Sequence, residues 1–348
     1  MADITPPPAY PATPFVAEAR ARGVVGAAPT LSVRDLLAQT GVDYSRIEQM
    51  CAALAVPVPN WDERAFTNKD LEALEWVTEL VDDGVLDAET EAALLRGISH
   101  SVERLVWWQF QVLADDAVRR LGLDDVEARI SVLDHIADLA DVLEAQMVYV
   151  WRRHLGATIR WIGRRLGEVP EGDSRSGALP LMRSVGFVDL VGYTETSGHL
   201  DAEGLAALVQ GFVATAADTV AKWGGRVVKS LGDAVMFSAG DPSSGAMIAL
   251  DLAETIGSNA LTPPARVAMV WGSVLDRFGD VFGPTVNLAS RLVAMADAGQ
   301  VVVDEVTAAV LASDSRVATI PLSPSLAAGI GQVTPYRLVK VSEPNSRW

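Results

Sequence analysis

The hydrophobic pattern of the chain changes once, and this change constrains the fold more than any other feature. Between about Leu31 and Leu166, apolar residues recur every three or four positions, the period of amphipathic helices. From Leu181 onward, short apolar runs typical of strands alternate with helical segments. The stretch GEVPEGDSRSGALP between them has the composition of a linker. The sequence therefore predicts an all-helical unit followed by an α+β unit.

The length of 348 residues, about twice that of a usual domain, agrees with two domains. We divide the chain into a flexible Pro- and Ala-rich extension (1–30), a helical domain (31–166), a linker (167–182), a mixed domain (183–341) and a tail (342–348). In the mixed domain we expect a strand at 184–190, a helix at 201–223 and a hairpin within 226–239. Its hairpins predict a mixed, mostly antiparallel sheet with flanking helices rather than a doubly wound one.

Charge and cysteine content limit the partners and the compartment. The formal net charge is −17, and a field of this sign repels polyanions, so we expect no nucleic acid and no anionic membrane as a partner. The single cysteine, Cys51, excludes an intrachain disulfide and favours the cytoplasm. We expect neither a secretion signal nor an integral membrane segment, since no uninterrupted apolar stretch of about 18 residues occurs.

Two aspartates interrupt strands that otherwise have a buried pattern. Asp189 ends the apolar run of SVGFVDLVGY, and Asp233 follows the turn in KSLGDAVMF. A lone aspartate at a strand end more often caps a turn or forms a salt bridge. Two carboxylates on neighbouring strand ends, however, form the oxygen-rich site that a hard cation such as Mg²⁺ needs. The pair therefore predicts a metal site.

The residues after Asp189 add a candidate phosphate site. Gly192 allows backbone N–H groups to approach an anion at the start of a helix. We therefore expect Gly192, Tyr193 and Thr194 to bind phosphate.

A third candidate group lies in GDVFGPTVNLASR. Asn287 and Arg291 are four residues apart on an expected helix and share one face. The guanidinium fork suits a phosphoryl oxygen. Such a pair is more often a solvated helix face. Here the neighbouring apolar residues leave few exposed positions, which favours a site.

The motifs FVDLVGYT, KSLGDAVMF and DVFGPTVNLASR, in this order, resemble the catalytic domain of class III nucleotidyl cyclases, specifically bacterial adenylate cyclases, over about residues 183–340. The resemblance implies a ferredoxin-like palm. It also implies a lyase that converts ATP to 3′,5′-cyclic AMP and pyrophosphate, through in-line attack of the ribose 3′-hydroxyl on the α-phosphate.

The resemblance further implies roles for the candidate residues. Asp189 and Asp233 would hold two Mg²⁺ or Mn²⁺ ions per site. Lys229 and Asp280 would recognise adenine, because an ammonium donates to N1 and a carboxylate accepts from the N6 amino group. Guanine offers the opposite pattern, so this pair favours ATP over GTP.

Asn287 would orient the ribose, and Arg291 would stabilise charge on the α-phosphate. Arg277 is a candidate for the remaining phosphates, although a loop charge is an equally good interpretation. Active sites in this family form between two catalytic domains, and this chain carries both halves of the residue set. A homodimer with two active sites is therefore implied.

Two other functions remain as alternatives. A palm-type cyclase or polymerase acting on GTP or polynucleotides shares the two carboxylates but predicts neither of the other residue pairs. A DNA-binding regulator is suggested by residues 31–90, which resemble a degenerate helix-turn-helix of the MerR type. This segment holds 13 acidic and four basic residues, which argues against DNA binding.

The helical domain resembles the N-terminal regulatory domains of some actinobacterial class III cyclases. A small molecule, a lipid or pH is a possible input. We expect its tryptophans, including Trp107, Trp108, Trp151 and Trp161, to be core residues rather than the lining of a ligand pocket. The basic stretch WRRHLGATIRWIGRRLGE is expected to form a helix that couples this domain to the catalytic dimer.

Overall fold

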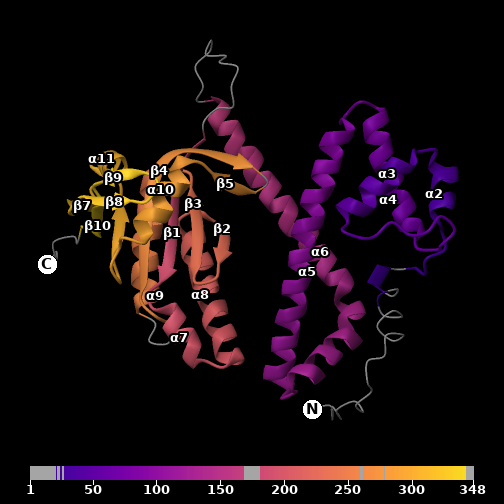
Figure 1. The fold of residues 1–348 in the computed structure, drawn as a ribbon, viewed down its shortest axis with the longest axis horizontal. Coiled ribbons are helices and arrows are strands. Elements are labelled where there is room, and N and C mark those ends of the chain that lie inside the picture. The colour runs from indigo at the N-terminus through magenta and orange to yellow at the C-terminus, as the bar shows by residue number, and fades with distance from the viewer. Residues whose placement is uncertain are drawn as a thin grey trace, which may run out of the picture. The chain divides into compact units, whose positions relative to one another are not determined.

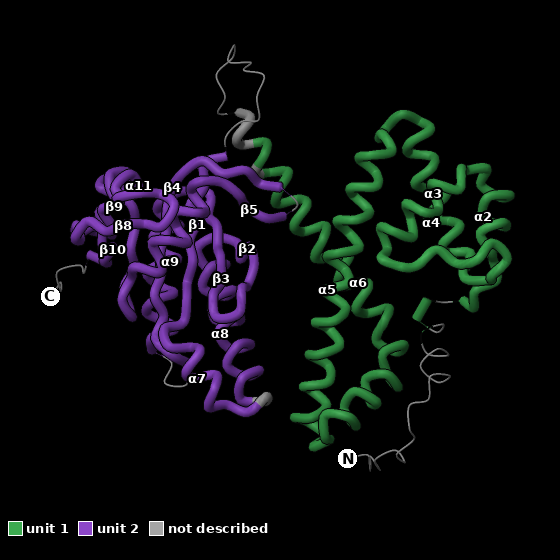
Figure 2. The backbone as a smooth tube through the Cα atoms, in the orientation of Figure 1, with its two compact units in different colours: residues 1–174 green, residues 175–348 purple. Residues whose placement is uncertain are grey.

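The computed structural model describes residues 21, 24–25, 27–167, 181–258, 262–277 and 279–341. The chain divides into two compact units, Met1–Ser174 and Arg175–Trp348 (Figure 2). Most of the predicted extension (1–30) and linker (167–182), and the whole tail (342–348), lie outside the described residues. Each unit is described by itself below.

The first unit is all-helical. Its described helices are α2 (Val33–Thr40), α3 (Tyr44–Ala53), α4 (Asn68–Asp82), α5 (Ala88–Leu121) and α6 (Asp125–Gly167) (Figure 1). Capping boxes at Ser32 and Thr67 begin α2 and α4, since each hydroxyl accepts a backbone N–H and an aspartate three residues later bonds back. A small core around Leu36, Ile47 and Cys51 joins α2, α3 and α4.

The long helices α5 and α6 pack against each other but leave large side chains exposed. Trp107, Trp108 and Trp151 are each more than 60% exposed. The prediction that these tryptophans are core residues is therefore wrong. The periodicity correctly indicated helices, but two helices alone cannot cover all the apolar residues that they carry.

The second unit is a mixed sheet with helices on both faces. Its strands are β1 (Leu181–Leu190), β2 (Arg226–Leu231), β3 (Ala234–Ala239), β4 (Ala265–Arg277), β5 (Asp280–Phe282), β6 (Val301–Val303), β7 (Val317–Pro321), β8 (Ser325–Ala327), β9 (Gly331–Val333) and β10 (Tyr336–Lys340). Its helices are α7 (Tyr193–His199), α8 (Ala202–Lys222), α9 (Pro242–Gly257), α10 (Pro284–Val293) and α11 (Glu305–Leu311).

The main sheet has the order β2-β3-β1-β4-β6-β10-β7. Strand β5 pairs antiparallel with the last residues of β4. The pairings of the main sheet are antiparallel except for the parallel contact of β4 with β6. The predicted fold class, a helical domain followed by a mostly antiparallel sheet with flanking helices, is confirmed. The short strands β5, β7, β8 and β9 were not predicted, since runs of three to five residues carry little periodicity.

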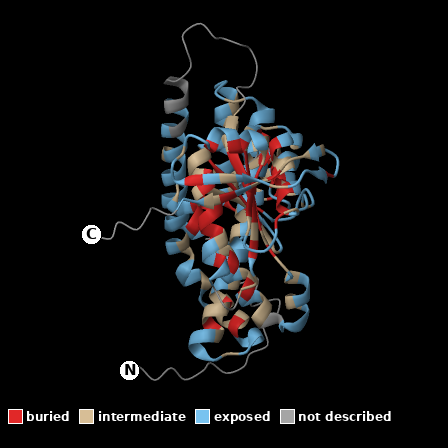
Figure 3. Ribbon diagram, turned by 90° about the vertical axis from the view of Figure 1, so that its left-hand side faces the viewer, coloured by how far each residue is buried: buried red, intermediate tan, exposed pale blue. Residues whose placement is uncertain are grey.

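The two faces of the sheet bury separate cores. Helices α8, α9 and α11 cover one face, where Phe212, Phe237 and Ile248 are fully buried. Helix α10 covers the other face and packs Leu292 against Met236 and its neighbours. Figure 3 shows the buried residues gathered on this sheet and its helices.

Helix α8 is the one described helix whose segment Gly204–Lys222 is long and apolar enough to cross a membrane. Its residues Phe212, Ala216 and Val220 belong to the core on the sheet. Packing within the second unit therefore accounts for part of the apolar character of α8, since 28% of this segment is buried.

Candidate active site

The two aspartates of the predicted metal site lie on adjoining strand ends. Asp189 is the penultimate residue of β1 and pairs in register with Ala234 of β3. The backbone N–H of Leu190 donates to the carbonyl oxygen of Asp233 at 3.1 Å. Gly232, with φ of 65°, and Asp233 form the tight turn between β2 and β3. The hairpin therefore brings Asp233 next to the end of β1.

Asp189 has a partner that sequence reasoning missed. Arg266, opposite Asp189 on β4, donates from Nε at 2.7 Å and lies 2.6 Å away through Nη2. Both contacts reach the same oxygen, Oδ2. The only signal in the sequence was a single arginine at the start of the apolar strand ARVAMV, and pairing it with Asp189 requires the strand register.

These residues fit a divalent cation. Two carboxylates supply hard oxygen ligands, and Arg266 uses only Oδ2 of Asp189. Within the described part of the chain, no group of three or more His, Cys, Asp or Glu residues is placed to hold a metal. Mg²⁺ is usually held by one or two carboxylates together with substrate phosphates, so two aspartates are a sufficient protein contribution.

The predicted base-recognition residues are in direct contact. Lys229 Nζ lies 2.6 Å from Asp280 Oδ2, and both side chains are about 30% exposed. Burial alone would raise the pKa of Asp280, but bonds from Lys229 and from the Val281 backbone N–H outweigh burial and lower this pKa below its usual value. Asp280 is therefore an acceptor at neutral pH.

A β-bulge orients Lys229. In the β2–β3 ladder Val227 pairs with Phe237 whereas Lys229 pairs with Met236, so Val228 is an extra residue. Side chains along a strand alternate between the two faces of the sheet. Without the bulge, Lys229 would therefore lie on the same face as Phe237, in the core under α8 and α9. With it, Lys229 shares the face of Met236, on which α10 packs. A bulge of this kind leaves no clear mark in the local sequence.

Asn287 and Arg291 are both exposed on α10, one turn apart. The opposite side of this helix buries Ala289 and Leu292. Among the described residues, no hydrogen bond or ion pair joins Asn287 or Arg291 to Asp189 or Asp233. The helix therefore presents the amide and the guanidinium outward, away from its own core.

The predicted phosphate residues are more dispersed. Gly192 is left-handed, with φ of 77°, and precedes the short helix α7. Tyr193 packs against the core, whereas Thr194 is exposed. Arg277 is exposed at the end of β4, opposite Asp280 in register.

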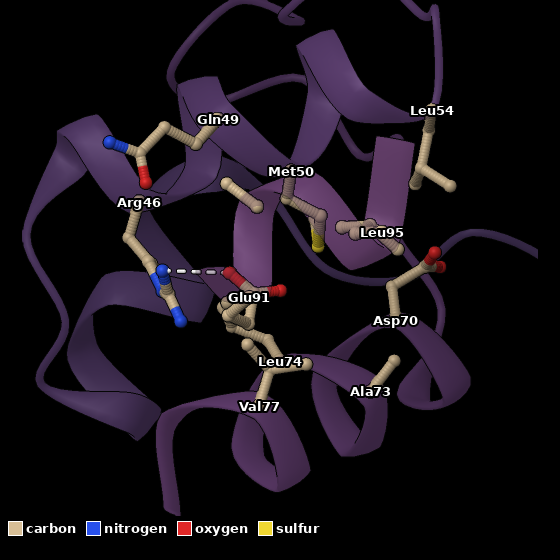
Figure 4. A pocket seen from close by; sticks show the side chains of 11 residues that line it. Arg46, Gln49, Met50, Leu54, Asp70, Ala73, Leu74, Val77, Glu91 and Leu95 are labelled. Carbon is tan, nitrogen blue, oxygen red and sulfur yellow. Dashed lines mark ion pairs between the residues drawn. The ribbon is translucent and has the colours of Figure 1, made fainter. Parts of the chain in front are cut away.

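A cavity of about 100 Å³ lies in the first unit (Figure 4). Met50, Leu74 and Leu95 are among its lining residues. Arg46 Nη1 and Glu91 Oε2 form an ion pair at 2.9 Å, and both side chains are largely buried. None of the predicted tryptophans or active-site residues lines this cavity.

Comparison with known proteins gives the family of the chain. Residues 183–339 match the Adenylate and Guanylate cyclase catalytic domain. An adenylate cyclase from Glutamicibacter nicotianae is 35% identical over 312 residues, covering 88% of this chain and 77% of the relative. An adenylate cyclase from Streptomyces coelicolor is 36% identical over 243 residues, covering 69% of this chain and 61% of the relative. The crystal structure of the adenylyl cyclase CyaB from P. aeruginosa aligns with 46% of this chain and 95% of its own, at 23% identity and a TM-score of 0.40.

The sheet and the matched domain define the class of the second unit as a nucleotidyl cyclase catalytic domain. The chain belongs to the adenylate and guanylate cyclase family. The relatives from Glutamicibacter nicotianae and Streptomyces coelicolor, both named adenylate cyclases, match most of this chain, so it is an enzyme of the adenylate cyclase type.

Proposed function

We propose that this protein converts ATP to 3′,5′-cyclic AMP and pyrophosphate in the cytoplasm. The observation that carries the proposal is the combination, in one unit, of adjoining aspartates at a strand end with a Lys229–Asp280 pair. The aspartates suit a phosphoryl-transfer site that uses divalent cations. The lysine–aspartate pair suits adenine.

In the proposed reaction, the ribose 3′-oxygen bonds to the α-phosphorus while the bond from this phosphorus to the bridging oxygen of pyrophosphate breaks. The hydroxyl proton passes to solvent. Asp189 and Asp233 would hold the cations, Mg²⁺ or Mn²⁺. When bound, such cations lower the pKa of the hydroxyl and offset the charge of the triphosphate.

The side chains on α10 act on the reacting group. Arg291 stabilises the charge that develops on the α-phosphate, because its guanidinium stays ionised and donates in a plane. Asn287 orients the ribose through its amide. Both are exposed on one helix face, an orientation that suits residues contributed to the active site of a second copy. We therefore propose a homodimer with two active sites.

GTP is the alternative substrate, since the matched family includes guanylate cyclases. Guanine carries an N1 donor and an O6 acceptor, the reverse of adenine. Lys229, a donor, would then face the N1 donor, and Asp280, an acceptor, would face the O6 acceptor, so neither could form a hydrogen bond. The ionised state of Asp280, favoured by its lowered pKa, therefore supports ATP.

Product analysis tests the proposal directly. The full chain is incubated with ATP or GTP and Mn²⁺ or Mg²⁺, and cyclic nucleotide is quantified. We expect cyclic AMP, and a loss of at least about 100-fold in kcat for Asp189→Asn or Asp233→Asn, since each removes a ligand charge at the reacting centre. Asp218→Asn, an exposed carboxylate on α8, is the matched control. Turnover retained in the Asp189 and Asp233 variants would contradict the metal assignment.

We also propose that the helical unit controls catalysis. Its compact, separate organisation supports this. The test compares the full chain with a shortened chain that begins at Leu181, across pH and with added lipids or small molecules. Equal activity of the two under every condition would contradict a regulatory role.

A further inference from the structure

The β4–β5 hairpin that carries Asp280 is attached to β2 by two ion pairs. One is the Lys229–Asp280 pair described above. In the other, Arg226 Nη2 lies 2.9 Å from Asp276 Oδ2, and Arg226 Nη1 donates to the carbonyl oxygen of Gly279 at 3.1 Å. Arg226 therefore bonds to the hairpin at two points, on β4 and immediately before Asp280.

The first attachment is shared with the proposed base site. Lys229 Nζ and Asp280 Oδ2 are 2.6 Å apart, and N1 and the N6 amino group are adjacent on adenine, so the base can bond both groups side by side. The ammonium and the carboxylate then divide their hydrogen bonds between each other and the base. This attachment of the hairpin to β2 therefore depends on what occupies the base site.

The second attachment does not involve the atoms that face the base. Two different nitrogens of Arg226 hold a side chain and a backbone carbonyl, a geometry that an arginine fork provides and a lysine does not. The Arg226 and Asp276 side chains are 39% and 28% exposed, so the pair is partly shielded from solvent. These bonds do not depend on what Lys229 and Asp280 bind.

We propose that Arg226 is a positioning residue for nucleotide selection. It holds the hairpin against β2 so that Asp280 stays beside Lys229 when both groups bond the base. This inference rests on the proposed function, because it assigns base recognition to Lys229 and Asp280. Arg226 itself touches neither the base nor the reacting atoms.

The test measures KM and kcat for ATP and GTP, and the affinity for 3′-deoxy-ATP, which lacks the attacking hydroxyl. For Arg226→Met we expect KM for ATP to rise about 5-fold or more, kcat to change less than about 2-fold and the preference for ATP over GTP to fall. The Kd of 3′-deoxy-ATP should rise with KM. Arg226→Lys keeps the charge but not both bonds, so its KM should lie between those of wild type and Arg226→Met.

A double-mutant cycle and a control separate positioning from a general loss of structure. Asp276→Asn should raise KM by no more than Arg226→Met does, since the bond from Arg226 to the Gly279 carbonyl remains. The double variant should be no worse than Arg226→Met, because Asp276 acts only through Arg226. Arg316→Met, which removes the pair between the half-exposed Arg316 and the largely buried Asp314, should change neither KM nor nucleotide preference. If Arg226→Met fails to fold, Asp276→Asn alone decides the question.

An unchanged KM and ATP preference in the Arg226 and Asp276 variants would overturn the inference. So would equal losses in those variants and in Arg316→Met. Lys229→Ala and Asp280→Ala test the proposed function separately. If those two variants alter nucleotide preference while Arg226→Met and Asp276→Asn do not, only this inference fails. If Lys229→Ala and Asp280→Ala leave the preference unchanged, base recognition by the pair is wrong.

Discussion

The two units differ in how far they bury their large apolar side chains. In the second unit, helices cover both faces of the sheet, and residues such as Phe212 and Phe237 are fully buried. In the first unit, α5 and α6 pack mainly on each other, and Trp107 and Trp108 are exposed. The difference shows that the proposed active site is built on a unit with a complete core of its own. The long helices of the first unit gain less stability per large side chain.

The ion pair of the proposed base site also differs from the buried pair of the first unit. Around the candidate active site, Lys229 and Asp280 are partly exposed, so a ligand can replace either partner. In the first unit, Arg46 and Glu91 are 13% and 8% exposed, so solvent can replace a lost partner only poorly. We therefore expect the Lys229–Asp280 pair to be exchangeable and the Arg46–Glu91 pair to be structural.

The largest expected effect on stability is in the second unit. Phe212→Ala empties a buried position between α8 and the sheet and should cost about 3–5 kcal/mol in the free energy of unfolding. Hydrogen exchange followed by mass spectrometry should show lost protection in α8 and β3, with α5 unchanged. Leu326→Ala, at a position 80% exposed, is the control. A loss of protection as large in α5 would contradict the independence of the two cores.

The next effect concerns the buried pair of the first unit. Glu91→Ala leaves the Arg46 guanidinium in the cavity without its counter-charge and should cost about 3 kcal/mol. Exchange protection should fall in α3 and α5. The exposed neighbour Glu89, changed to Gln, is the control.

A double variant sharpens this prediction. Arg46→Met combined with Glu91→Leu removes both charges and should recover most of the stability that Glu91→Ala loses. If Glu91→Ala alone has no effect on unfolding, the pair is not structural and the contrast with the pairs at the active site disappears.

A smaller, pH-dependent effect is expected at Asp251 on α9. Burial would raise the pKa of this carboxyl, but bonds from Lys222, Lys340 and Trp223 outweigh it and lower the pKa to about 2. Because the folded pKa lies below the unfolded value, the ionised carboxyl stabilises the fold above pH 4. This contribution, about 2 kcal/mol, is lost as pH falls from about 4 through 2.

Unfolding in denaturant at pH values between 6 and 2 checks this sign. Asp251→Asn should be less stable than wild type at pH 6, and the difference should shrink toward pH 2. Glu254→Gln, at the 69% exposed partner of Lys340, should behave like wild type. A difference that stays constant with pH would show that ionisation of Asp251 is not its source.

The sequence predicted more of the second unit than of the first. The apolar runs located β1 and the β2–β3 hairpin, and the interrupted strand ends predicted that Asp189 lies near Asp233. The pairing of Lys229 with Asp280 was expected only from the resemblance to the cyclase family. The pairing of Arg266 with Asp189 could not be predicted, because strand register is set by non-local contacts. The bulge before Lys229 was missed for the same reason.

In the first unit, periodicity identified helices but not which apolar residues they bury. A helix pattern gives the direction of an apolar face, whereas burial depends on what packs against it. Trp107 and Trp151 were therefore assigned to a core that does not reach them. The buried pair of Arg46 and Glu91 joins α3 to α5 and has no local signature in the sequence.

The smallest expected effect is at Trp107, 68% exposed on α5. Trp107→Ser should change the free energy of unfolding by less than about 0.5 kcal/mol, since little buried area is lost. Trp223→Phe is the matched substitution of a tryptophan in the second unit. It removes the bond from Nε1 to Asp251, 2.8 Å long, and should cost about 1 kcal/mol. Both are measured by denaturant unfolding of the full chain.

A loss above about 1.5 kcal/mol for Trp107→Ser would mean that this indole is covered in solution, because only a desolvated side chain of this size gives so large a change. The exposed face of α5 would then count as part of a core, and the contrast between the two units would not hold.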